Sequence, residues 1–159
     1  MIQRIQSLYL ILAAICLFLT VFLGFSLYAW NDGADAVLFN IFGLEGTVTD
    51  AGVWFPYKFV IPGIAALCIF AVLQFKNRKL QMNICKILYL LLLALIVFLF
   101  MDVYGLKDTF TQLAGDADKL AFSPGVGMYC PVAALPLVYL ANRRIKKDED
   151  LVKSVDRLR

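Results

Sequence analysis

The four cysteines, Cys16, Cys68, Cys85 and Cys130, are the first residues in this chain whose type suggests a reaction. A thiol redox centre needs two cysteines whose Cα atoms lie about 4.4–6.8 Å apart, so that one thiol can exchange with the other. The sequence contains no Cys-x-x-Cys pair. A cysteine inside an apolar stretch ordinarily packs as a small hydrophobic side chain. We therefore expect the four cysteines to pack rather than to react.

The ionisable residues do not suggest a transport or catalytic site. The chain has no histidine, which excludes a proton relay or a metal site built on imidazole. Lys58 and Asp102 fall near the ends of apolar stretches, whereas a coupled carrier needs a titrating group deep in the membrane. An enzyme acting on lipid through Asp102, Asp108 and Asp116 would need a further metal or partner. Gly125-Val126-Gly127 lacks the surroundings of a nucleotide loop. We expect no catalytic residue, cofactor or metal.

The composition is that of a membrane protein. Hydrophobic residues make up 62% of the chain and charged residues 17%, against about 45–50% and about 25% in soluble domains. The mean hydropathy is +0.79. The net charge of +3 does not indicate nucleic-acid binding, because basic clusters beside apolar spans are expected in any case.

Four apolar stretches are separated by loops whose charge alternates in sign. We expect an all-α membrane protein, a four-helix transmembrane bundle with spans at about residues 7–30, 56–75, 82–104 and 124–142, each long enough for a hydrocarbon core of about 30 Å. The run at 7–30 is too long for the apolar part of a signal peptide and ends in interfacial aromatics, so we expect it to be retained. Residues 1–142 would then form the transmembrane domain.

The basic residues indicate the orientation. Short basic loops resist translocation, so the basic clusters are expected on the cytoplasmic side, leaving Lys58, Lys107 and Lys119 outside. This predicts a multi-pass protein of a bacterial inner membrane with both termini in the cytoplasm. The expected cytoplasmic residues are Arg4, Lys76, Arg78, Lys79, Lys86, Arg143, Arg144, Lys146, Lys147, Lys153, Arg157 and Arg159.

Two outer loops connect the expected spans. Residues 36–42 are rich in β-branched and aromatic side chains and are followed by Gly43 and Gly46, which favours a small extracytoplasmic β-hairpin between spans one and two. The alternative is a partly ordered loop whose Phe39, Ile41 and Phe42 dip into the headgroups. The acidic loop at 105–123 has a short amphipathic helix as one option.

The fourth span and the segment after it differ from the rest. Gly125, Gly127, Ala133 and Ala134 are small residues that let helices approach closely in a bilayer, so this span is expected to be the most tightly packed. Residues 143–159 are expected to form a cytoplasmic tail that is first basic and then amphipathic. Either an apolar stripe on this tail docks on headgroups or on a partner, or the tail is a solvated extension of the helix. The apolar stripe consists of Leu151, Val152, Val155 and Leu158.

Three strings of residues resemble a family. They are the opening MIQRIQSLYL, the loop KNRKLQ at 76–81 and the ending LANRRIKKDEDLVKSVDRLR at 140–159. Together they resemble a domain-of-unknown-function family of integral membrane proteins from Bacteroidota. The resemblance implies an inner-membrane location and four spans but no assigned activity. It favours the cytoplasmic face as the working surface.

These observations predict a non-enzymatic accessory, scaffold or assembly protein of the inner membrane. We expect it to contact membrane lipid and either a protein partner or further copies of itself, but no nucleic acid. The alternative is binding or transport of a lipid or small apolar molecule inside the bundle, between the second and fourth spans. The candidate interaction surface comprises Arg4, Lys76, Arg78, Lys79, Arg143, Arg144, Leu151, Val152, Val155 and Leu158.

Overall fold

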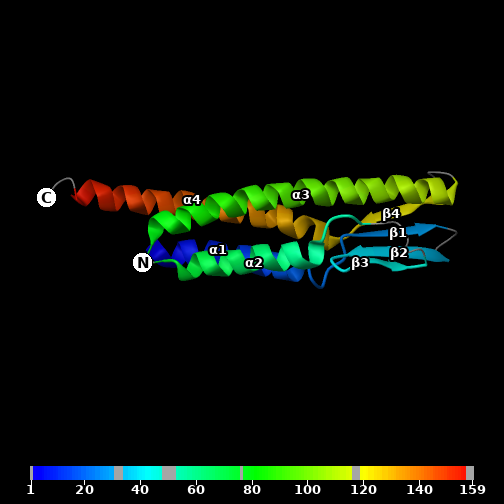
Figure 1. The fold of residues 1–159 in the computed structure, drawn as a ribbon, viewed down its shortest axis with the longest axis horizontal. Helices are drawn as coiled ribbons and strands as arrows, with labels where there is room; N and C mark the ends of the chain where they lie inside the picture. The colour runs from blue at the N-terminus through cyan, green and yellow to red at the C-terminus, as the bar shows by residue number, and fades with distance from the viewer. Residues whose placement is uncertain (1, 31–33, 48–52, 76, 116–118, 157–159) are drawn as a thin grey trace.

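The computed structural model describes residues 2–30, 34–47, 53–75, 77–115 and 119–156. Helices and strands both occur, and the sheet combines strands from two separate parts of the chain (Figure 1). In chain order the elements are α1 (Ile2–Leu19), β1 (Ser26–Trp30), β2 (Asp35–Asn40), β3 (Gly43–Gly46), α2 (Tyr57–Leu73), α3 (Arg78–Ala114), β4 (Ala121–Pro124) and α4 (Val126–Asp156).

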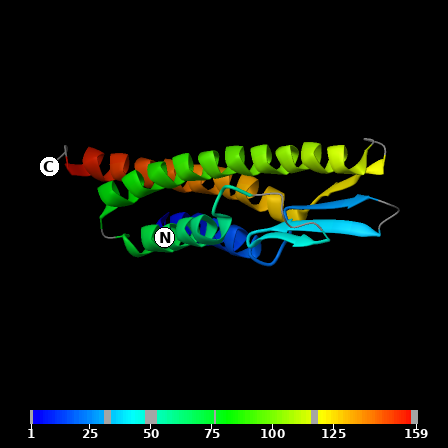
Figure 2. The ribbon, with the colours of Figure 1, turned by 45° about the vertical axis from the view of Figure 1, so that its right-hand side comes forward.

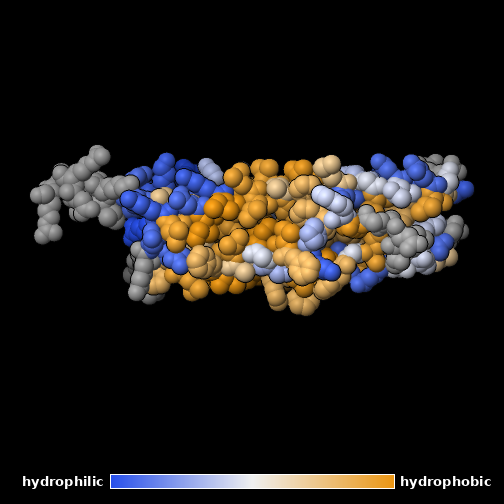
Figure 3. All heavy atoms as spheres, in the orientation of Figure 1, coloured by the Kyte–Doolittle hydropathy of each residue, from blue (hydrophilic) through white to orange (hydrophobic). Residues whose placement is uncertain are grey.

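The molecule is elongated, with its helices side by side and its sheet at one end (Figures 1 and 2). Helix α3 runs along both parts, whereas α1 and α2 end before the sheet begins. Helix α1 begins at the end of the helices opposite the sheet, and α4 extends past it in the same direction (Figure 1). A central apolar band separates two more hydrophilic ends on the face shown in Figure 3.

The strands form one antiparallel sheet in the order β3-β2-β1-β4. Leu27 of β1 pairs with Leu38 of β2 on one side and with Ser123 of β4 on the other. Along β1, Tyr28 and Trp30 are buried whereas Leu27 is exposed. This alternation gives the sheet one packed face and one open face.

The packed face of the sheet lies against the second half of α3. The Tyr28 ring centroid is 5.0 Å from that of Phe110, and its hydroxyl donates a hydrogen bond of 2.7 Å to the Val103 carbonyl oxygen. Trp30 stacks on Phe110 at 5.4 Å. Burial raises the pKa of Tyr28 to about 12, and the opposing effect of the Ser26 hydroxyl is smaller. These contacts fix the sheet on α3.

Helix α3 has clear start and stop residues. The Asn77 side chain accepts a hydrogen bond of 3.2 Å from the Leu80 N–H, and Gly115 ends the helix with a φ of 78°. Its 37 residues make a helix about 55 Å long at about 1.5 Å per residue. The helix therefore contains the predicted span at 82–104 and continues through Phe110 and Leu113, where a separate short helix was one option.

The predicted all-α fold, a four-helix transmembrane bundle, is wrong. The described residues form a four-stranded antiparallel sheet in addition to the helices. Among the described helices, α3 is the one long and apolar enough to cross a membrane, while α2 and the apolar part of α1 are shorter. One such helix supports association with a membrane, and the helix lengths do not support a multi-pass arrangement.

The first predicted span, 7–30, was expected to be one helix, but it contains the end of α1 and the whole of β1. Helix α1 ends at Leu19, where the Thr20 hydroxyl donates a 2.5 Å hydrogen bond to the Leu17 carbonyl oxygen. The chain then turns and enters β1. Hydropathy alone does not distinguish a buried strand from a helix in a continuous apolar run. Burial alternates along Ser26–Trp30, but the buried Ser26 and the exposed Leu27 hide that alternation in the sequence.

The other predicted boundaries also shift. The span at 56–75 corresponds to α2, with 17 residues. The span at 124–142 begins inside β4, and α4 then continues past residue 142 to Asp156. Residues 35–46 do form a hairpin, with Asn40 opposite Gly43, but it belongs to the larger sheet. Phe39 and Ile41 are buried in protein, rather than placed among headgroups.

Helix α4 starts against the chain between α1 and β1. The Gly125 N–H donates to the Phe25 carbonyl at 2.8 Å, and the Gly127 N–H donates to the Gly24 carbonyl at 3.1 Å. A Cβ atom on Gly125 would lie 2.2 Å from the Gly24 oxygen, and one on Gly127 would lie 2.5 Å from the Leu23 oxygen. The two backbones meet so closely that neither glycine position has room for a side chain.

The two predicted packing alanines lie on different faces of α4. Ala134 is fully buried, whereas Ala133 is exposed. Successive helical residues point about 100° apart, so adjacent alanines need not share an environment. Of the four small residues predicted to pack closely, Gly125 and Gly127 meet the chain between α1 and β1, Ala134 is buried and Ala133 is exposed.

Candidate functional site

The described residues of the predicted interaction surface lie away from the sheet, at the start of α3 and in the second half of α4 (Figure 1). Its described side chains are exposed or half-buried, and they are Arg78, Lys79, Arg143, Arg144 and Leu151. The side chains of Arg4, Val152 and Val155 lie outside the described part of the structure, as do Lys76 and Leu158 entirely.

A buried polar contact lies beneath this surface and was not predicted. The Gln6 amide nitrogen on α1 donates a hydrogen bond to the Asp148 carboxylate on α4. Asp148 and its neighbour Glu149 are each only 8% exposed. Both follow the buried Ile145 at helical spacings of three and four residues, which was a signal that they share its inward face. The start of α1 is thereby tied to the far part of α4.

Helices α2 and α3 are joined by a second buried polar contact. The Gln81 amide donates a 3.0 Å hydrogen bond to the Ala71 carbonyl oxygen. About one turn along each helix, Cys68 and Cys85 are both fully buried. All four cysteines carry free thiols. The sequence could not reveal the contact between Gln81 and Ala71, because that contact depends on the register of two packed helices.

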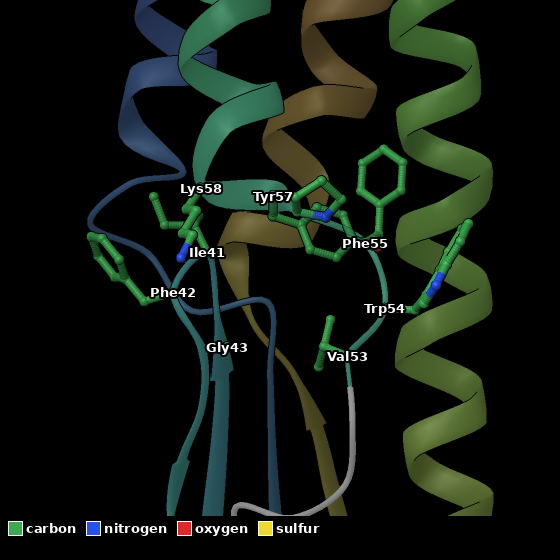
Figure 4. A pocket seen from close by; sticks show the side chains of 9 residues that line it. Ile41, Phe42, Gly43, Val53, Trp54, Phe55, Tyr57 and Lys58 are labelled. Carbon is green, nitrogen blue, oxygen red and sulfur yellow. The ribbon is translucent and has the colours of Figure 1, made fainter.

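A pocket of about 240 Å³ lies where the sheet meets the helices (Figure 4). One wall is the turn between β2 and β3, and the other is the segment that leads into α2. Figure 4 shows the Lys58 side chain reaching from the start of α2 toward that turn. The lining residues are Ile41, Phe42, Gly43, Val53, Trp54, Phe55, Pro56, Tyr57 and Lys58.

The rim of this pocket combines exposed aromatic rings with one cation. Trp54 is 86% exposed, and Phe42 and Phe59 are 67% and 70% exposed. The Lys58 ammonium lies 5.1 Å from the centroid of the Phe59 ring, a favourable cation–π distance. Figure 4 shows Phe42 and Trp54 on opposite sides of the pocket, so the exposed rings flank it rather than form one cluster. The rim is therefore a candidate contact surface.

Tyr57 links the pocket to α3. Its hydroxyl donates a 2.6 Å hydrogen bond to the Asp102 carboxylate, and its ring packs 5.5 Å from Phe25 and 5.7 Å from Phe39. The sequence placed Asp102 near the end of an apolar stretch, at the interface, and did not identify Tyr57 as its partner. A hydrogen bond to an ionised carboxylate is stronger than one between neutral groups, so this pair fixes the start of α2 against α3.

The structure describes two of the three acidic residues considered for a lipid enzyme, Asp102 and Asp108, and these two do not share a site. Asp102 is bonded to Tyr57, Asp108 is exposed further along α3, and Asp116 lies outside the described residues. Across the residues that the structure describes, no group of three or more histidine, cysteine, aspartate or glutamate side chains is placed to hold a metal ion.

The match to a family covers nearly the whole chain. A family model described as Domain of unknown function (DUF4293) matches residues 2–158. The chain belongs to this family. The match includes every helix and strand described above, so the sheet and the helices of this DUF4293 protein are parts of one family unit. A comparison with curated proteins found no match.

Proposed function

We propose that this DUF4293 protein is a non-enzymatic accessory or scaffold protein of a bacterial inner membrane, and that it binds a protein partner through the charged end of its helices. The observation that carries the proposal is the far end of α4, which extends beyond the other helices in Figures 1 and 2. A helix that leaves its own bundle has surface available for another molecule.

The exposed apolar surface of α3 supports the membrane location. Only 33% of its most apolar 18-residue window is buried in the protein, whereas the core helix of a soluble protein would be mostly buried. Leu90 and Met101 are each 65% exposed, and Val97 is 49% exposed. Hydrocarbon is the environment in which such side chains cost nothing to expose. We propose that α3 crosses the membrane here and that α1 and α2 pack beside it.

The distribution of charge supports an orientation. Basic residues gather at the start of α3 and in the far part of α4, and basic segments favour the cytoplasmic side. Exposed aromatic residues such as Trp54 and Phe59 lie at the opposite boundary of the apolar band, a position typical of the membrane interface. The basic start of α3 would then face the cytoplasm, and the aromatic boundary would face the outside.

Leu151 marks the proposed contact on α4. It is 51% exposed and follows the buried pair Asp148 and Glu149, so the helix at this point is anchored on one side and open on another. An anchored helix loses less entropy on binding than a free tail. Nearby lysine and arginine residues can also attract anionic lipid, at about 1 kcal/mol each, which would orient the contact without defining the partner.

Co-purification tests this proposal. The full chain, a Leu151→Asp variant and a Leu113→Asp variant are isolated from native membranes in mild detergent. Leu113 is the matched control, because it is an equally open leucine, 58% exposed, at the opposite end of the molecule. We expect one set of proteins to be lost with Leu151→Asp and kept with Leu113→Asp. Recovery of the same proteins with all three forms would contradict the docking role of α4.

The alternative function, binding of a lipid or small apolar molecule, is favoured by one observation. The pocket beside Lys58 opens among exposed aromatic residues. Its position differs from the predicted one, since it lies at the junction of the sheet and α2 rather than between the second and fourth helices. The two functions are compatible, because they use opposite ends of the molecule.

A further inference from the structure

We propose that the pocket between the β2–β3 turn and the start of α2 binds the headgroup of an anionic phospholipid. The inference rests on the membrane location proposed above, which places this pocket at the outer boundary of the apolar band. The pocket would hold the phosphate and glycerol of one lipid, while the acyl chains lie outside it on the apolar surface of the helices.

The charge of the lining selects an anion. Of the nine described residues that line the pocket, Lys58 alone carries a charge. In Figure 4 its side chain points toward the β2–β3 turn, which forms one wall of the pocket. The nearest described interaction of that ammonium is with the Phe59 ring, 5.1 Å away. An aromatic ring interacts with an ammonium group more weakly than an anion does, so a phosphate oxygen would bind the Lys58 ammonium more strongly than the ring does.

The size of the pocket excludes a whole lipid. Pockets that enclose drug-sized ligands usually measure about 300–1,000 Å³, and this one measures about 240 Å³. A phosphate with its glycerol fits that volume, whereas two acyl chains do not. The ligand must therefore be one whose polar part enters and whose apolar part stays outside.

The surroundings of the pocket suit those remaining chains. Phe42 on the β2–β3 turn and Phe59 on α2 are 67% and 70% exposed, and both border the pocket or its cation. Trp54, 86% exposed, has the amphipathic ring that is enriched at the headgroup level. A soluble phosphate compound would gain nothing from these rings, whereas a phospholipid would cover them.

Native mass spectrometry of the full chain in mild detergent tests the inference. The protein is mixed with equal amounts of phosphatidylglycerol and phosphatidylcholine, and the lipid retained by wild type, Lys58→Gln, Lys58→Arg and Lys107→Gln is compared. Lys107 is the matched control, because its ammonium also lies over an aromatic ring, 5.4 Å from Phe122, but away from the pocket. Lys58 is exposed, so its replacement leaves the fold intact.

We expect the wild type to retain phosphatidylglycerol in preference to phosphatidylcholine. Lys58→Gln should retain about tenfold less, the change expected when one charge-assisted contact is lost, whereas Lys58→Arg and Lys107→Gln should match the wild type. Equal retention by Lys58→Gln, an equal loss with Lys107→Gln or equal binding of phosphatidylcholine would overturn the inference. Displacement of the lipid by inorganic phosphate would identify a free-phosphate site and overturn it as well.

A membrane wash separates this inference from the proposed function. Wild-type protein is extracted from native membranes at alkaline pH. Release of the wild type would refute the membrane location, and the lipid site with it. If the wild type stays in the membrane and the Lys58 variants bind lipid normally, only the lipid site is refuted.

Discussion

Gly127 provides the most direct test of how α4 is attached to the rest of the fold. A Cβ atom added at this position would lie 2.5 Å from the Leu23 oxygen and 2.8 Å from the Gly24 oxygen. Ordinary contact begins at 3.4 Å, so Gly127→Ala must push two backbone segments apart by almost 1 Å. The shift would also stretch the hydrogen bond from the Gly127 N–H to Gly24, which is 3.1 Å long.

The expected cost follows from these contacts. Overpacking costs about 1–3 kcal/mol, and weakening one backbone hydrogen bond adds up to about 1 kcal/mol. Alanine recovers about 1 kcal/mol through its higher helix propensity. The net destabilisation is about 2 kcal/mol, which lowers the melting temperature of a chain of this size by about 4–8 °C.

Gly105→Ala is the matched control for this prediction. Gly105 lies inside α3, and a Cβ atom built there meets no atom within 4 Å. Only the propensity gain of up to about 1 kcal/mol applies, so this variant should melt slightly above the wild type. Melting is followed in mild detergent for all three proteins. If Gly127→Ala melts at or above Gly105→Ala, the close backbone contact at α4 does not exist as described.

Three further predictions concern the buried contacts. Tyr57→Phe should destabilise the protein by about 1–3 kcal/mol, because it leaves the partly buried Asp102 carboxylate without its hydrogen-bond donor. A double-mutant cycle with Asp102→Asn should show coupling between the two positions. Strict additivity of the two changes in unfolding free energy would argue against the hydrogen bond. Ala134→Leu should lower the melting temperature through overpacking, whereas Ala133→Leu, at an exposed position, should leave it almost unchanged. Equal effects of the two substitutions would mean that the buried face of α4 has been assigned wrongly. The pKa of Tyr28 rises from 10.0 to about 12 on folding, so its contribution to stability is complete below pH 10 and is lost as the pH rises toward 12. Denaturant titrations across that range should show a decline that is smaller in Tyr28→Phe, and identical declines in the two proteins would exclude Tyr28 as its cause.

The sequence predicted the parts of the fold that are encoded locally. The spans predicted at 56–75 and 82–104 fall on α2 and α3, because each is a long apolar run with a turn signal at its end. Helix α3 then continues past the predicted end at residue 104 to Ala114, and Gly115 ends it. The hairpin at residues 35–46 was likewise visible in its β-branched and glycine residues.

The rest of the sheet was not predictable from local sequence. Leu27 pairs with Ser123, and no property of either segment identifies the other as its neighbour. Without that pairing, the apolar residues of β1 were taken as the end of a helix. Hydropathy indicates that a segment is buried, but it does not distinguish a helix in lipid from a strand packed on protein.

The candidate site was only partly predictable for the same reason. The basic residues at the helix ends stand out in the sequence because charge is a property of each residue alone. The bond between Tyr57 and Asp102 joins residues 45 positions apart, and the pocket beside Lys58 combines two separate segments. Both depend on the packing of α2 against the sheet and α3, which composition and spacing do not specify.

The pairing of β1 with β4 has a consequence for how the chain is made. Strands β1, β2 and β3 leave the ribosome early, but β4 follows α2 and α3, so one edge of β1 has no strand beside it during most of synthesis. An unpaired strand edge is a template for joining other chains, and contacts between distant segments form slowly. A chain that stops after α3 would carry this open edge permanently. Incomplete copies should therefore associate with one another or be degraded, whereas arrival of Ala121–Pro124 closes the edge and brings the start of α4 into position.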